Sequence, residues 1–201
     1  MSTQSVIAIA LCLVPACLGF GAMARADDPD LVVLAPTKAP YVIKGSTAAD
    51  LRSQMNQLGP FSPKENRRFD AKTVSNPFAN FTSGGKKGKS CKLKTVKVTV
   101  TTQFIMPQWV PPAGADPALV AKWAAFLTKV QIHEDGHQQL SIDAGKDLLA
   151  KFKALPEASS CPALLESAKK VQQQAQATLD ANHEKYDIST KHGETQSAKF
   201  P

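Results

Sequence analysis

The sequence predicts an α+β fold in which a small antiparallel sheet packs against a long central helix and a C-terminal helix. Residues 116–155 carry apolar side chains at three- and four-residue steps, which is typical of an amphipathic helix. A second helix with the same spacing is expected from Pro162 onward. Between residues 93 and 104 the apolar side chains alternate instead, which indicates a strand that ends before Pro107.

Shorter elements precede this strand. Residues 31–34 and 41–44 are strand candidates, and Thr47-Ala48-Ala49-Asp50 resembles a capping box at the start of a helix that Gly59-Pro60 ends. Residues 60–90 hold many Pro, Asn, Ser and Gly and predict a loop with one short strand near Thr73. The strands therefore surround one short helix, and the two long helices follow them.

The most informative motif is His133-Glu134-Asp135-Gly136-His137. Asp116 and Pro117 form a start signal for the helix that carries it, and Pro156 marks the end. On a helix, residues four apart share one face, and here that face continues the apolar stripe. The two imidazoles can therefore hold Zn²⁺ on the inward side, in a zincin-like arrangement, while Glu134 takes a proton from water.

A less specific interpretation is that His133 and His137 merely face the core and that Glu134 is incidental. Burying three such side chains without a metal or partners is costly, which favours the metal site. A zinc site also needs a third protein ligand, and spacing alone leaves His183, on the C-terminal helix, and His192, which follows it, as candidates. Gly193 gives the backbone freedom to turn a loop back toward the motif.

The first 26 residues predict a secretory signal peptide, because residues 6–23 are almost continuously apolar and small residues before Asp27 offer cleavage sites. A membrane anchor and lipid attachment at Cys17 are the alternatives. Removing 26 of the 201 residues leaves 175, which suits a single domain at residues 27–201 with no membrane span. We expect an exported protein, periplasmic or secreted.

Charge and cysteine content fit export. The net charge of +7 falls to +6 because only Arg25 is lost with the signal, and no nucleic-acid motif accompanies this excess. Anionic lipids, wall polymers or acidic substrates are more plausible partners. Cys91 and Cys161 are the two cysteines left, and in an oxidising compartment they predict a disulfide, with a thiolate metal site as the alternative.

The chain also resembles the secreted bacterial domain of unknown function 922, a family described as predicted zinc-dependent proteases. The specific pieces are the His-Glu-x-Gly-His motif and Thr190-Lys191-His192-Gly193. The weaker pieces are Tyr41, Gly45-Ser46-Thr47, Leu51, Leu58-Gly59-Pro60, Cys91, Pro107-Gln108-Trp109, Trp123, Cys161 and Tyr186-Asp187. The resemblance implies His133 and His137 as metal ligands, His192 as the third ligand and Glu134 as the catalytic acid/base.

These observations predict an exported zinc metallohydrolase that cuts a peptide or amide bond in an envelope protein or in the peptide part of the wall. Tyr186 is able to donate a hydrogen bond to an oxyanion, although it can equally close the apolar side of the C-terminal helix. The alternative function is a non-catalytic binding module whose metal is structural. A closed four-ligand site would favour that alternative, and an open position beside a groove would favour hydrolysis.

Overall fold

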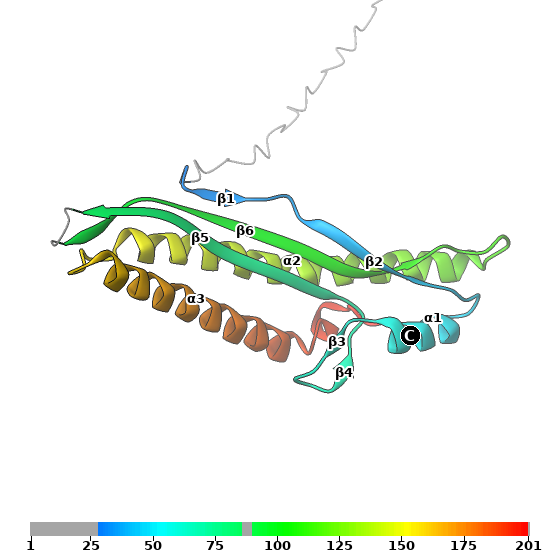
Figure 1. Cartoon of the computed structure of the whole chain (residues 1–201). Helices are drawn as coiled ribbons and strands as arrows, with labels where there is room; N and C mark the ends of the chain where they lie inside the picture. Colours follow the sequence, from blue (N-terminus) through cyan, green and yellow to red (C-terminus); the bar gives the residue numbers. More distant parts are fainter. Residues whose placement is uncertain (1–27, 86–89, 201) are drawn as a thin grey trace, which may run out of the picture.

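The computed structural model, which describes residues 28–85 and 90–200, consists mainly of a mixed sheet and two long helices (Figure 1). The α+β class predicted from the sequence is confirmed. The elements in chain order are β1 (Leu31–Val33), β2 (Thr37–Ile43), α1 (Ala48–Leu58), β3 (Phe61–Ser62), β4 (Arg67–Arg68), β5 (Lys72–Gly85), β6 (Cys91–Trp109), α2 (Pro117–Lys153), α3 (Cys161–Thr190) and the short 3₁₀ helix η1 (Glu194–Gln196).

The sheet is built around β6, the longest strand. β5 pairs with β6 antiparallel along one side, whereas β1 and β2 pair with its other side in parallel. The prediction of a wholly antiparallel sheet is therefore wrong. The chain reverses direction once between β2 and β5, through α1 and the β3–β4 hairpin, and again between β5 and β6. Two reversals make β2 and β6 run the same way.

Two strands, β5 and β6, are longer than the sequence predicted. β6 buries alternate residues from Val96 to Phe104, as expected, but it continues through Pro107 to Trp109. The first residue of β5, Lys72, lies opposite Ile105, so from Met106 to Trp109 only β2 pairs with β6, and a proline is tolerated at such an edge. β5 itself is a 14-residue strand, where the sequence predicted a loop with one short strand.

The start signals of the helices behave as predicted. The Thr47 hydroxyl accepts from the Asp50 N–H, and the Asp50 carboxylate accepts in return from the Thr47 N–H, so the capping box is complete. The Asp116 carboxylate accepts from the Ala118 N–H at the start of α2. Ser160 caps α3 in the same way, through the Ala163 N–H.

Two apolar cores lie along the length of α2. The first joins β1, β5 and β6 to the C-terminal part of α2 and to α3, and the Cys91–Cys161 disulfide lies at the same end of the molecule. The predicted disulfide is thus confirmed. The second core joins β2, β6 and α1 to the N-terminal part of α2 and to Phe200. The motif residues lie on α2 between these two cores.

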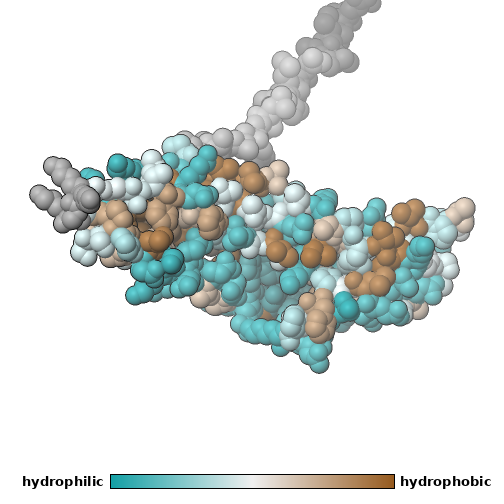
Figure 2. Space-filling model, in the orientation of Figure 1, coloured by the Kyte–Doolittle hydropathy of each residue, from teal (hydrophilic) through white to brown (hydrophobic). Residues whose placement is uncertain are grey.

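No helix within the described ranges is both long enough and apolar enough to cross a bilayer. The face in Figure 2 is mostly hydrophilic around α3, with apolar groups spread along the length of the molecule over the strands. The predicted signal peptide, including Cys17, lies outside the described residues and stays a prediction.

Candidate metal centre

The two motif histidines lie together on the inward face of α2. Their ring centroids are 4.8 Å apart, and both side chains are buried. The His133 Nε2 atom lies 3.2 Å from Asp187 Oδ1, and the His137 Nε2 atom lies 3.1 Å from the same oxygen. Two imidazole nitrogens and a carboxylate oxygen therefore point at one position, where they can hold a metal ion.

Asp187, near the end of α3, is the third member of this cluster. In the sequence, Asp187 stands only among the weaker pieces of the family resemblance, because nothing in its local spacing ties it to His137, 50 residues earlier. Burial alone would raise the pKa of the Asp187 carboxyl, but hydrogen bonds from His133 and His137 lower it well below its usual range. The group is therefore ionised and available to a cation. Ligand atoms around tetrahedral zinc lie roughly 3.3 Å apart, given Zn–N and Zn–O bonds of about 2.0–2.1 Å, which these distances match.

His192 lies at the edge of the cluster. Lys191, His192 and Gly193 all have positive φ values, so the chain turns back sharply after α3. The turn brings His192 Nδ1 to 3.7 Å from Asp187 Oδ1, while its Nε2 lies 3.5 Å from a Glu65 oxygen. The predicted turn at Gly193 is present, and His192 is near enough to act as a fourth ligand after a small movement.

A second layer of hydrogen bonds orients the two motif histidines. His133 Nδ1 lies 2.9 Å from Gln196 Oε1, and His137 Nδ1 lies 2.9 Å from His183 Nδ1. Burial, together with the nearby His137, lowers the pKa of His183 to about 4, so its ring stays neutral and its Nδ1 can accept a hydrogen bond from His137. Because Nδ1 of each motif histidine makes this supporting contact, Nε2, which faces Asp187, is the nitrogen that a metal can take in place of a proton.

Glu134 is buried beside the histidines. Its Oε2 atom accepts a 2.6 Å hydrogen bond from the Thr73 hydroxyl on β5. Burial raises the pKa of Glu134, and the Thr73 hydrogen bond partly offsets that effect. The Glu134 carboxylate is therefore a stronger base than an exposed glutamate.

Tyr186 packs against the histidines. Its ring stacks on His133 with centroids 5.1 Å apart, and its hydroxyl accepts from Gln196 Nε2 at 3.0 Å. A side chain at Gly136 would overlap this hydroxyl, which explains why glycine stands inside the motif. In this conformation Tyr186 holds the histidine rings in place, and its predicted contact with an oxyanion stays untested.

The cluster opens into a cavity of about 730 Å³ between β5, α2 and α3, which we call the metal groove. Apart from its four histidines, the charged lining is mostly acidic: five carboxylates (Glu65, Glu134, Asp180, Glu184 and Asp187) face two lysines (Lys64 and Lys72). Such a lining favours a cation.

Fold and site together define an α+β protein with a candidate metal centre of two histidines and one aspartate. The chain belongs to DUF922, a family of bacterial proteins of unknown function, whose model matches residues 38–193. The match includes every residue of the cluster but ends before Gln196. No curated protein and no solved structure matches the chain. The family thus confirms the resemblance but assigns no activity.

Proposed function

We propose that the protein is an exported zinc-dependent metallohydrolase that cuts peptide bonds. The observation that carries the proposal is the position of Glu134. This buried carboxylate lines the same groove as His133, His137 and Asp187, although a purely structural metal site has no need of a base there. Imidazole and carboxylate ligands suit zinc among the common metals.

When bound, zinc would polarise a substrate carbonyl and acidify water. Glu134 accepts the proton of the attacking water and passes it to the leaving amine. Thr73 keeps the Glu134 carboxylate turned into the groove through its hydroxyl. His183 and Gln196 keep both Nε2 atoms directed at the metal position.

The edge of β5 supports a peptide substrate. Farther along the strand, the Gln172 carboxamide hydrogen-bonds to the Ala79 N–H and the Pro77 carbonyl, which therefore face away from β6. Because backbone groups alternate along a strand, those of Thr73 and Ser75 face the same way, and both residues line the metal groove. An extended peptide can pair with these backbone groups as an added strand.

The disulfide supports the location. A Cys91–Cys161 bridge is typical of proteins from oxidising compartments and rare in the reducing cytosol. With the predicted signal segment, it favours export to the periplasm or beyond, where envelope proteins and wall peptides are available substrates.

Glu134→Gln tests the mechanism. It keeps the side-chain volume and removes the proton acceptor, so zinc content should stay at the level of the parent while hydrolysis of labelled casein falls by about 10²–10⁴-fold. Glu166→Gln, the same acid-to-amide change at an exposed position of α3 outside both cavities, is the matched control and should keep activity. Equal hydrolysis by Glu134→Gln and the parent would refute the role of Glu134.

One observation favours a second function, a binding module with a structural metal. With His192 Nδ1 at 3.7 Å from Asp187, four protein ligands can close around one ion. X-ray absorption of the zinc-loaded protein separates the two functions. Three protein ligands and a water support hydrolysis, and four protein ligands with no water support the structural site.

A further inference from the structure

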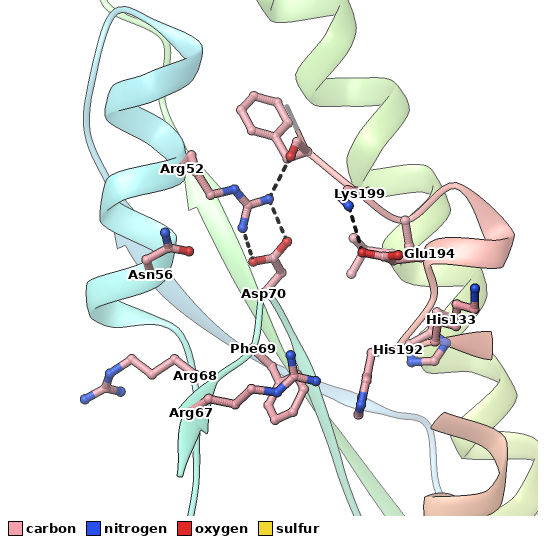
Figure 3. A pocket seen from close by; sticks show the side chains of 14 residues that line it. Arg52, Asn56, Arg67, Arg68, Phe69, Asp70, His133, His192, Glu194 and Lys199 are labelled. Atoms are coloured by element: carbon pink, nitrogen blue, oxygen red, sulfur yellow. Dashed lines mark hydrogen bonds and ion pairs between the residues drawn. The ribbon is translucent and has the colours of Figure 1, made fainter. Parts of the chain in front are cut away.

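A second cavity, of about 370 Å³, meets the metal centre from the other side, and we call it the basic chamber (Figure 3). It lies between α1, the β4 strand and the segment that follows α3. His133, His192 and Phe69 line both this chamber and the metal groove. A molecule bound at the metal can therefore extend past these three residues into the chamber.

The charge of the chamber is opposite to that of the groove. Five cationic side chains line it against two carboxylates: Arg52, Arg67, Arg68, Lys191 and Lys199 against Asp70 and Glu194. The excess is three positive charges, and it is still two when Glu65, which pairs with Arg67 at 3.1 Å from just outside, is included. The chamber thus favours an anion.

Two of these cations, Arg52 and Arg68, already make hydrogen bonds within the protein. Arg52 makes two hydrogen bonds to the Asp70 carboxylate and a third to the Phe200 carbonyl, which ties α1 to the C-terminal segment (Figure 3). Arg68 donates to the Gly59 carbonyl and lies over the Phe61 ring. These side chains form the wall of the chamber and are not free to turn toward a ligand.

Two cations remain close to the metal side. Arg67 lies over the Phe69 ring at 4.2 Å, and that ring lies 4.8 Å from the His192 ring, so the three side chains form a stack that leads to the metal centre. Lys191 directly precedes His192 and makes no ion pair with any residue in 28–85 or 90–200. Both cations border the passage between the two cavities.

Glu194 already occupies part of the chamber and shows what the site attracts. Its carboxylate pairs with Lys199 at 2.8 Å. Lys199 lowers the pKa of Glu194 most, and Lys191 and Arg67 lower it further. Three cations therefore act on one position inside the chamber, and a single carboxylate does not neutralise them.

We propose that the basic chamber binds a carboxylate of the substrate, next to the bond that is cut at the metal centre. The proposal rests on the proposed peptidase function and narrows its substrates to acidic peptides. The carboxylate is either the C-terminal group of the peptide or the side chain of an Asp or Glu residue, since both present the same planar pair of oxygens to Lys191 and Arg67.

Binding measured without hydrolysis tests this. Three alanine hexapeptides are titrated into isotopically labelled protein and followed by nuclear magnetic resonance: one neutral and amidated, one with a free C-terminal carboxylate, and one amidated with a single Glu. The first titrations use metal-free protein, and the second use zinc-loaded Glu134→Gln, which does not cut them. At least one acidic peptide should bind about tenfold more tightly than the neutral one in both forms.

Lys191→Met should remove most of that preference, because it keeps the length of the side chain and loses the charge. Lys170→Met, at an exposed position of α3 outside both cavities, should leave it intact. A preference for the free C-terminus indicates removal of terminal residues, and a preference for Glu indicates internal cleavage. Either one supports the chamber.

Three results would overturn the proposal. They are equal binding of neutral and acidic peptides, equal effects of Lys191→Met and Lys170→Met, and a preference that exists only with zinc present, which would place the carboxylate on the metal. Failure of the parent protein to cut any peptide would instead refute the peptidase function. The peptide-binding measurements do not depend on cleavage, so their outcome would still test the basic chamber.

Discussion

The metal groove and the basic chamber share His133 and His192 but carry opposite charge. Five carboxylates and two lysines line the groove, whereas five cations and two carboxylates line the chamber. The chain as a whole has a net charge of +7, yet its candidate metal centre faces the acidic side. Net charge therefore says little about a particular site, because charges beyond about 8–10 Å are screened at physiological salt.

His133 marks the division between the two cavities. Its Nε2 faces Asp187 in the groove, and its Nδ1 faces Gln196 in the segment that borders the chamber. One ring thus has a metal-binding side and a supporting side. The comparison teaches that a single imidazole can lie between a cavity with an excess of carboxylates and a cavity with an excess of cations.

The largest expected effect comes from removing the groove carboxylate at the centre. Asp187→Asn loses the ionised oxygen that both Nε2 atoms face. Removing supporting residues of metal sites typically costs about 10–100-fold in affinity, so removing this ligand should cost more than about 100-fold. Competition with a coloured chelator measures the zinc affinity. Glu184→Gln is the control, and zinc binding that is equal in the two variants would show that Asp187 is only one of several acids.

Substitutions of His192 and His183 test which histidines beyond the motif bind the metal. We expect His192→Ala to weaken zinc binding by up to about 100-fold, as a ligand at the edge of the cluster. His183 contacts His137 but is not a member of the cluster of His133, His137 and Asp187. Its 2.9 Å contact with His137 leads us to expect an intermediate loss of about tenfold. The same chelator assay ranks them, and a larger loss in His183→Ala would transfer the ligand role to His183.

The parts of this site that the sequence predicted are those with local signals. His133, Glu134 and His137 are a spacing on one helix, and Asp116 with Pro117 fixes where that helix begins. The disulfide needed only the count of cysteines after the signal segment. In each case neighbouring residues, or a single count, carry the information.

The parts that were missed depend on contacts between distant segments. Most of β5 was not predicted because two of its inward residues are polar. Thr73 makes a hydrogen bond to Glu134, and Ser75 makes one to Ser141. A period-two search for apolar residues therefore finds little there. Asp187 and Gln196 reach the centre only because α3 and the turn after it pack against α2, and no local pattern encodes that packing.

The smallest expected effect is also the most direct test of the opposed charges. Neutralising one exposed groove acid, Asp180→Asn, should weaken zinc binding about two- to threefold, because exposed charge pairs contribute little. Neutralising one chamber cation, Lys191→Met, should strengthen zinc binding by a similar factor, since it removes a repulsion from the metal. Both shifts should vanish in 1 M salt, where the screening length is about 3 Å.

The signs of the two shifts in zinc affinity are the informative result, because Asp180→Asn makes the protein more positive near the metal position and Lys191→Met makes it less positive. Shifts that survive in 1 M salt would mean that the substitutions alter the shape of the site. Shifts of the same sign at low salt would mean that the two cavities do not act on the metal as opposed fields. If the two variants shift the zinc affinity in opposite directions and high salt removes both shifts, electrostatics is the cause. The charges on the two sides of His133 then act on the metal in opposite ways.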